Sequence, residues 1–419
     1  MRKTLVAAGI AGLMLATCAV GPAMAVESAP RPARVHLPSP TGAFSVGVVP
    51  LHLVDHSRSD PWQSARAPRE LMVSVFYPAR GAARHPVARQ MPAGAAAGFD
   101  TFAGPLNYGV PAGTAAWAET LTDAHGGAPV APGRHPVVLY SPGAGDIRDW
   151  NTGLVQDLVS HGYIVVTIDH TYEAAAVQFP DGRVADSVLL SRFAEAQKSG
   201  TVPALLEKVL DTRVADTRFV LDQLTTLATG ADPDAEHRHL PSGLGRAMDL
   251  DRIGMFGQSA GGFTAAETMY SDPRIKAGID LDGTLGFSSE PDGSHLSPVA
   301  HHGLDRPFLL MGSSGDGGSN HHAEPSWASF WDNSRGWHAD ITLDDSRHGS
   351  FTDAESLLPQ LAGRLPTGSV TGQLGTLAPS RAVATERAYV SAFFDRWLRN
   401  HDNHLLDGGP TSYPVTFIR

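Results

Sequence analysis

Hydrophobic and polar residues alternate in two stretches near the start of the chain. Phe44, Val46 and Val48 share one side of the first stretch, and residues 71–75 repeat the pattern. A period of two residues is typical of a β-strand with one buried face. We therefore predict an antiparallel pair of strands at the edge of a sheet.

From residue 135 onward the hydrophobic residues form solid runs. The runs that we expect to be strands cover residues 135–141, 163–170, 253–257, 277–281, 306–312 and 339–344. Strands of this kind are buried on both faces, as in a parallel sheet covered by helices. Helical spacing marks residues 151–161, 206–227 and a closing amphipathic helix around residues 389–398. The pattern predicts an α/β fold: a mostly parallel central sheet flanked by helices, with antiparallel N-terminal edge strands.

Two stretches lack such periodicity. Residues 26–42 are rich in Pro, Ser and Ala, and we interpret them as a flexible leader. Residues 85–132 are dominated by Ala, Gly and Pro, and we interpret them as a surface excursion with a short helix near residues 114–121. Because the chain shows no internal repeat, residues 43–419 are expected to form a single α/β domain.

The first 25 residues resemble a signal peptide. Arg2 and Lys3 precede a short apolar region that ends near Val20, and Ala-Met-Ala at 23–25 suits cleavage before Val26. A membrane anchor is less favoured, because the apolar region is short and Gly-Pro follows it. Lipidation at Cys18 is a weaker alternative. We therefore expect a secreted, extracellular protein.

Charge and cysteine content narrow the function classes. Without Arg2 and Lys3, 30 basic side chains remain against 43 acidic ones, a net charge of −13. This balance argues against a nucleic-acid partner and against simple docking to anionic membranes. Cys18 is the only cysteine, so the mature chain has no disulfide, no catalytic thiol and no cysteine-bound metal.

One motif carries chemistry. Residues 257–261 read Gly-Gln-Ser-Ala-Gly, the only Gly-x-Ser-x-Gly in the chain. A serine hydroxyl becomes a nucleophile when a base takes its proton, and a sharp strand-to-helix turn lifts Ser259 to where a base can reach it. Small flanking residues allow that turn. A purely structural Gly-rich turn is the alternative, but the predicted strand before the motif and helix after it favour catalysis.

The oxyanion that forms during ester cleavage needs two backbone N–H donors. The residue after the nucleophile, Ala260, supplies one in this type of turn, at the positive end of the following helix. The other is expected from the loop after an earlier strand. Residues 141–145, Ser-Pro-Gly-Ala-Gly, follow such a strand, and we predict the N–H of Ala144 as the second donor.

The base and the acid come later in the chain. His348 follows the last predicted strand and precedes the closing helix, so it is the candidate base among 19 histidines. Two carboxylates stand after strands: Asp282, at the end of residues 277–281, and Asp316, after residues 306–312. The pattern alone leaves both open. The acid would orient the imidazole and stabilise its charged form.

The chain resembles the isoform II platelet-activating-factor acetylhydrolases and related bacterial secreted lipases and esterases, members of the α/β-hydrolase superfamily. The resemblance runs from HPVVLYSPGAG through DLVSHGYIVVTIDH and DRIGMFGQSAGG to AGIDLDG, and returns at HGSFTD. It implies Ser259 as nucleophile, His348 as base, Asp282 as acid with Asp316 as the alternative, and Ala144 and Ala260 as the oxyanion hole. Relatives usually carry His at positions 142 and 258, where this chain has Pro142 and Gln258.

We therefore expect a secreted serine carboxylic-ester hydrolase that acts through an acyl-enzyme. The expected substrates are short- to medium-chain acyl esters, including lipids or polyesters, with at most transient contact with lipid interfaces. A peptidase or amidase on the same fold, or a non-catalytic binding protein, are the alternatives. No cofactor motif is present, and the adjacent pairs His301-His302 and His321-His322 lack the spacing of metal ligands, so neither cofactor nor metal is expected.

Overall fold

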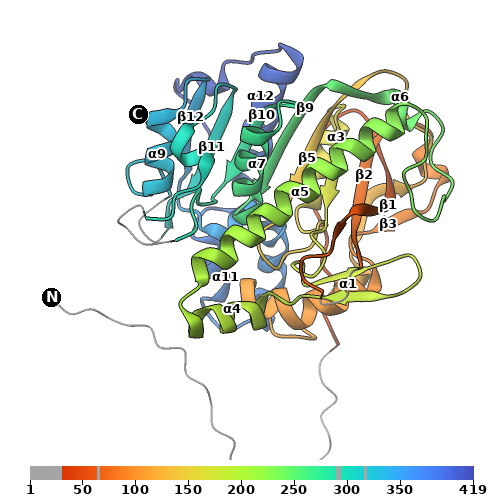
Figure 1. Cartoon of the computed structure of the whole chain (residues 1–419), viewed down its shortest axis with the longest axis horizontal. Coiled ribbons are helices and arrows are strands. Elements are labelled where there is room, and N and C mark those ends of the chain that lie inside the picture. The colour runs from red at the N-terminus through yellow and green to blue at the C-terminus, as the bar shows by residue number, and fades with distance from the viewer. Residues whose placement is uncertain (1–30, 64–66, 289–293, 316–318) are drawn as a thin grey trace, which may run out of the picture. The chain divides into compact units, whose positions relative to one another are not determined.

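The computed structural model describes residues 31–63, 67–288, 294–315 and 319–419. Within them, a large sheet follows the strand order β13-β12-β11-β10-β9-β5-β6-β2-β1-β4-β3 (Figure 1). Its parallel centre runs from β12 to β6. The central strands are β5 (His135–Ser141), β6 (Ile164–Ile168), β9 (Met248–Gln258), β10 (Ile275–Leu281), β11 (Phe308–Ser313) and β12 (His338–Leu343). Every solid hydrophobic run of the sequence is one of these strands.

Antiparallel strands flank the parallel centre. β1 (Ser45–Ser59) pairs with β2 (Pro68–Ala79), as the alternating pattern predicts, and β2 pairs with β6. Beyond this pair the sheet continues through β4 (Leu121–Gly126) and β3 (Val87–Arg89), and β13 (Val415–Ile418) adds to the opposite side. These outer strands are too short to give a hydrophobic period, so the sequence does not indicate them.

Helices cover both faces of the sheet (Figure 1). On one face, α3 (Thr152–Ser160) and α12 (Pro379–Arg399) pack into a core with β5, β6 and β9. On the other, α5 (Val202–Ala228), α7 (Ala260–Ser271) and α9 (Pro325–Asn333) form a second core. The remaining elements are β7 (Ala176–Gln178), β8 (Val184–Asp186), α4 (Leu189–Ser199), α6 (Leu244–Ala247), α8 (Pro298–His302), α10 (Ala354–Leu357) and α11 (Ser369–Leu374), with 3₁₀ turns at η1 (Ala82–Arg84), η5 (His348–Phe351), η6 (Leu358–Arg364) and η7 (Leu405–Asp407). None of the helices in the described ranges has the length and apolarity to cross a membrane.

The stretch 85–132 is more ordered than its composition indicates. After η1 and β3 it contains α1 (Ala93–Gly98), the π-helical segment η2 (Phe99–Ala103) and α2 (Gly104–Tyr108). The helix expected near residues 114–121 is the single 3₁₀ turn η3 (Trp117–Glu119). Aromatic rings join these turns into a third core, because Phe99 lies 4.2 Å from Trp150 and 5.3 Å from Trp117, centroid to centroid.

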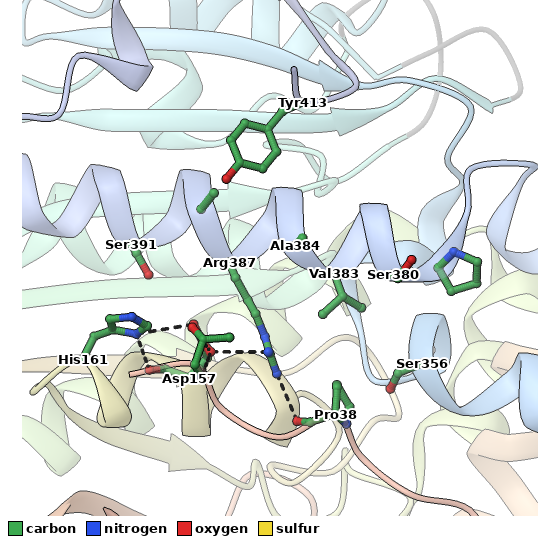
Figure 2. A pocket seen from close by; sticks show the side chains of 13 residues that line it. Pro38, Asp157, His161, Ser356, Ser380, Val383, Ala384, Arg387, Ser391 and Tyr413 are labelled. Carbon is green, nitrogen blue, oxygen red and sulfur yellow. Dashed lines mark hydrogen bonds and ion pairs between the residues drawn. The ribbon is translucent and has the colours of Figure 1, made fainter. Parts of the chain in front are cut away.

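The predicted leader is described only from residue 31 onward. The backbone N–H of Thr41 donates to Asp157 on α3 at 2.8 Å, and Arg387 on α12 donates to the carbonyl of Ser39 at 3.0 Å. Arg387 lines a groove of about 600 Å³ together with Pro38 and Asp157, and Figure 2 shows its side chain reaching from α12 toward Asp157. The predicted domain boundaries stay predictions, and the predicted signal peptide lies outside the described residues.

Three carboxyl groups are buried where α10 meets α12. Burial raises the pKa of Asp353 to about 7 and the pKa values of Glu355 and Glu386 to about 8. The charges of Asp353 and Glu355 raise the pKa of Glu386 further, while the charge of Arg387 opposes the shifts at Asp353 and Glu386. Backbone N–H groups of α3 also oppose the shift at Asp353. These side chains therefore hold protons near neutral pH.

We expect Trp150→Ala to lower the free energy of unfolding by about 3–5 kcal/mol, because it empties the centre of the third core. Urea denaturation of the variant measures this loss. Leu190→Ala is the control, since that side chain is 59% exposed on α4, and it should stay within about 0.5 kcal/mol. Similar losses in both variants would show that the aromatic cluster does not contribute to stability.

Candidate active site

Ser259 stands between β9 and α7 in a strained conformation. Its φ of 55° and ψ of −123° lie where residues with a side chain are uncommon. Two backbone hydrogen bonds hold it there: its N–H donates to Leu281 at 2.8 Å, and its carbonyl accepts from Phe263 at 3.1 Å. The serine side chain therefore sits at the tip of a sharp turn, half-buried, as the motif predicts.

The glycines of the motif are required by close contacts. A Cβ on Gly261 would lie 1.9 Å from the carbonyl oxygen of Ser141, and one on Gly257 would lie 2.2 Å from the backbone of Gly261. At Gly262 it would lie 1.7 Å from the carboxylate of Asp280. The turn thus packs its backbone directly against the ends of β5 and β10.

Asp282 and His348 form a hydrogen-bonded pair next to this turn. Nδ1 of His348, in η5 after β12, lies 2.7 Å from Oδ2 of Asp282, which directly follows β10. Ser313 donates its N–H to Oδ1 of the carboxylate at 2.7 Å and its hydroxyl to Oδ2 at 3.1 Å. The carboxylate is buried, while the imidazole is 56% exposed. The acid is therefore fixed and the base faces solvent.

The pair shifts both titrations. Burial disfavours the charged form of each partner. The hydrogen bond between the two side chains and the attraction of their opposite charges act on both pKa values in the other direction, and their sum outweighs burial. The pKa of Asp282 is lowered and the pKa of His348 is raised, with a further contribution to the histidine from Asp146. Asp282 is ionised at neutral pH, which suits it to orient and stabilise an imidazolium.

The two other carboxyl groups near these strands differ. Asp316 lies outside the described residues. Asp280 is fully buried inside β10, accepts the N–H of Gly283 at 2.9 Å, and has a pKa raised well above its ordinary value by burial. The structure therefore pairs His348 with Asp282.

Gln258 makes a contact that the sequence reasoning missed. Its amide nitrogen lies 2.9 Å from Nε2 of His348 and 3.4 Å from the carbonyl oxygen of the same residue. Because Nδ1 faces a carboxylate, Nδ1 carries the proton and Nε2 accepts from Gln258. Among the hydrogen bonds of the described residues, none joins His348 to the hydroxyl of Ser259. The only earlier signal was that relatives usually have His at position 258.

The loop after β5 lies beside the nucleophile, as predicted. Ser141 pairs with Gly257 across β5 and β9, and a Cβ on Gly143 would lie 2.4 Å from Oε1 of Gln258. Ala144 is exposed at the tip of this loop. Ala260 is the first residue of α7, so its N–H has no partner within the helix. The roles of Ala144 and Ala260 as donors stay predictions.

A buried carboxyl group supports the loop from below. Asp146 accepts the hydroxyl of Tyr108 at 2.6 Å and the amide of Asn107 at 3.0 Å, and Asn107 also donates to the carbonyl of Ala144 at 3.1 Å. Burial raises the pKa of Asp146 to about 6, against these hydrogen bonds and the charge of His348. The stretch 85–132 thus reaches the site through α2.

Side chains that could bind a metal ion lie close together away from the candidate catalytic residues. Within the described ranges, one group of three possible ligands lies close together: Asp402, His404 and Asp407, all exposed. Arg396 already pairs with both aspartates, at 3.3 and 3.0 Å. The adjacent histidines were not expected to bind metal, and one of them, His321, has its Nδ1 2.8 Å from a carboxylate oxygen of Asp340. The groove of Figure 2 is lined by none of the candidate catalytic residues.

Comparison with known proteins identifies the family. The model of the family "Platelet-activating factor acetylhydrolase, isoform II" matches residues 31–290. The chain belongs to this family. The acetylhydrolase family model covers β1 to β10 and therefore includes the Gly-x-Ser-x-Gly turn and Asp282.

Individual relatives agree with this assignment. A protein of Arthroderma benhamiae named "Probable 1-alkyl-2-acetylglycerophosphocholine esterase" is 27% identical over 416 residues, 92% of this chain and 95% of that protein. The platelet-activating factor acetylhydrolase of Cavia porcellus is 28% identical over 158 residues, 36% of this chain and 35% of that protein. A solved ferulic acid esterase from Streptomyces cinnamoneus is 34% identical with a TM-score of 0.70, covering 92% of this chain and 100% of the other. This member of the acetylhydrolase family is a carboxylic ester hydrolase with the α/β-hydrolase fold.

We expect Gly261→Ala to disrupt the turn, because its Cβ would collide with the carbonyl of Ser141 at 1.9 Å. Backbone atoms must shift, so the free energy of unfolding should fall by about 3 kcal/mol and ester hydrolysis with it. Gly363→Ala is the control, since nothing lies within 4 Å of its Cβ position. Thermal melting and p-nitrophenyl ester turnover measure both; a fully active Gly261→Ala enzyme would contradict the tight contact.

Proposed function

We propose that the chain is an exported serine esterase in which Ser259, His348 and Asp282 form the catalytic triad. The observation that carries the proposal is the 2.7 Å bond between His348 and the buried Asp282, next to the strained turn that presents Ser259. The predicted signal peptide supports export. Membership in a family of esterases supports the reaction class.

The mechanism follows from these roles. His348 takes the proton of the Ser259 hydroxyl through Nε2, and the serine oxygen attacks the ester carbonyl. Because the amide of Gln258 lies 2.9 Å from Nε2, it must move aside before this transfer. The imidazolium then gives the proton to the leaving alcohol, an acyl-enzyme forms, and water activated by the same histidine releases the acid.

The negative charge that develops on the carbonyl oxygen needs donors in place beforehand. We assign this role to the N–H groups of Ala144 and Ala260. Ala260 begins α7, where the helix dipole adds to the attraction. Each such donor contributes about 10²–10³ in rate.

The names of the relatives suggest which esters to test as substrates. We propose short- to medium-chain acyl esters, with an acetylated glycerophosphocholine and a ferulate ester as the two compounds to compare. The chain departs from the usual family residues at Pro142 and Gln258, both next to the reacting atoms, so its preference need not follow either relative. Turnover of both compounds by the same preparation ranks them directly.

We expect Ser259→Ala to abolish hydrolysis of p-nitrophenyl esters and labelling by a fluorophosphonate. Asp282→Asn should lower kcat by about 10⁴-fold, because the amide no longer stabilises the correct tautomer and the imidazolium. Circular dichroism of both variants checks the fold. Retained labelling in Ser259→Ala would contradict the proposed nucleophile.

The pH profile should report the environment of His348. Only the neutral imidazole accepts the proton, so kcat/KM should fall as the pH drops through the raised pKa of His348, above the ordinary value of about 6.5. Asp282 and Asp146 are the carboxyl groups whose charge acts on the ring.

Two substitutions should move this acid limb in opposite directions. Gln258→Leu removes a donor to the neutral ring, so the limb should shift upward by about half to one pH unit. Asp146→Asn removes a negative charge that favours the imidazolium, so the limb should shift downward. Identical profiles for both variants and the parent enzyme would exclude His348 as the titrating base.

A further inference from the structure

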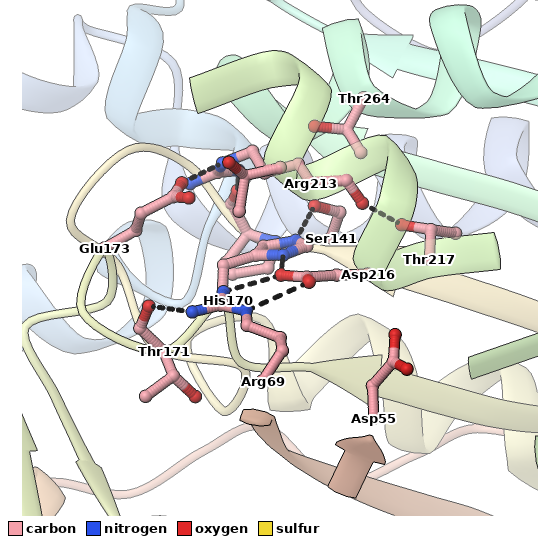
Figure 3. A network of polar contacts seen from close by, with 12 residues as sticks. Asp55, Arg69, Ser141, His170, Thr171, Glu173, Arg213, Asp216, Thr217 and Thr264 are labelled. Atoms are coloured by element: carbon pink, nitrogen blue, oxygen red, sulfur yellow. Dashed lines mark hydrogen bonds and ion pairs between the residues drawn. The ribbon is translucent and has the colours of Figure 1, made fainter. Parts of the chain in front are cut away.

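A network of buried charged side chains contacts the loop of residues 141–145, and Figure 3 shows its members around Ser141. Arg69 donates to Asp216 at 2.7 Å and to Asp60 at 2.8 Å, and Arg213 donates to Glu173 at 2.8 Å. The side chains of Arg69 and Asp216 are 0% exposed. Burying ion pairs costs desolvation energy and is weak evidence for a role in stability alone.

The network contacts the loop at three successive residues. The hydroxyl of Ser141 lies 2.9 Å from Nε2 of His170, whose Nδ1 lies 3.1 Å from Asp216. Arg213 donates to the carbonyl of Pro142 at 2.7 Å and to the carbonyl of Gly143 at 3.3 Å. The two carbonyl oxygens are thus held by one planar guanidinium, a geometry that lysine's single ammonium group does not reproduce.

The chain Ser141–His170–Asp216 has the same order of atoms as a catalytic triad, but its serine is fully buried. Burial lowers the pKa of His170 to about 4, with a further contribution from the charge of Arg213, so the ring is neutral. Nδ1 then donates to Asp216, and Nε2 accepts the hydroxyl of Ser141. We interpret this arrangement as an anchor for the loop, since no substrate reaches its hydroxyl.

The carbonyl of Gly143 accepts two hydrogen bonds, one from Arg213 at 3.3 Å and one from the N–H of Asp146 at 3.2 Å, and together they fix the direction of the peptide group that follows. In a trans peptide, the C=O and the following N–H point in opposite directions. No cis peptide occurs within the described residues. Because the carbonyl of Gly143 points down to Arg213, the N–H of Ala144 points up, away from the buried network.

We propose that Arg213 is a positioning residue that holds the N–H of Ala144 in place as an oxyanion donor. This inference rests on the proposed serine-esterase function. Arg213 does not touch the substrate; together with the N–H of Asp146 it prevents the Gly143–Ala144 peptide from rotating. Glu173 in turn holds the guanidinium in its plane.

The test is Arg213→Lys, compared with Arg387→Lys. Arg387 is the matched control, because it is also buried and donates to backbone carbonyls, those of Pro38, Ser39 and Gly153, but on the opposite face of the sheet. We expect Arg213→Lys to lower kcat about 10²–10³-fold, the effect of one lost oxyanion donor, with KM changed less than about threefold. Arg387→Lys should keep kcat within about twofold, whatever its melting temperature.

A transition-state analogue separates positioning from a general loss of structure. A trifluoromethyl ketone with the acyl group of the substrate forms an oxyanion on Ser259, so its affinity should fall by the same factor as kcat/KM. Glu173→Gln, which is isosteric, should show the same correlation with a smaller loss, and it serves if Arg213→Lys does not fold. Unchanged analogue affinity in the folded variants, or equal loss of kcat in Arg387→Lys, would overturn the proposal.

The activities of Ser259→Ala and Arg213→Lys together distinguish failure of the proposed triad from failure of the proposed role of Arg213. If Ser259→Ala stays active, the proposed function fails, whatever Arg213→Lys does. If Ser259→Ala is inactive while Arg213→Lys behaves as the parent enzyme, the triad stands and the role of Arg213 is rejected.

Discussion

The contact between the nucleophile turn and the end of β5 is the constraint on which the site depends. Gly261 lies against the carbonyl of Ser141 with no space for a single methyl group. Because of this contact, the chain turns from β9 into α7 within one residue, and Ser259 adopts a strained backbone conformation with a positive φ angle. The loop after β5 and Asp282 after β10 flank the same turn, so a shift of the turn would separate the reacting groups from their supports.

The chain shares its reaction class with its family, and two further side chains act on the histidine that we propose as the base. The amide of Gln258 lies on Nε2 of His348, and the carboxyl group of Asp146 acts on the same ring from below. The charge of Asp146 raises the pKa of His348, and the amide of Gln258 makes a hydrogen bond to the same ring.

Much of the architecture was predictable because burial on both faces leaves a plain signature. The runs at residues 135–141 and 277–281 contain few polar residues, and each became a central strand. β3, β4 and β13 left no such signature, since strands of three to six residues hardly establish a period. The Ala-rich helices of residues 93–108 were missed because they pack through small side chains and a few aromatic rings rather than a Leu or Val stripe.

The candidate site could be predicted from the sequence to the extent that local motifs define it. Ser259 follows from its turn, and His348 from its place after the last parallel strand. The choice between Asp282 and Asp316 needed a resemblance, because both follow strands and pairing with the histidine is a long-range contact. The contacts of Gln258 and Arg213 join residues 90 and 71 positions apart, and no pattern along the chain encodes such pairs.

The three buried carboxyl groups at the junction of α10 and α12 make the stability of the fold depend on pH. Asp353, Glu355 and Glu386 bind protons in the folded chain at pH values where an unfolded chain has released them. Their contribution to stability is therefore fully present only below about pH 4, the ordinary carboxyl pKa, and is lost progressively as the pH rises to about 7 to 8. His348 works in the reverse sense, because it needs to lose its proton. These three groups therefore favour the folded chain in acid, whereas the proposed role of His348 as a base needs a pH above its raised pKa.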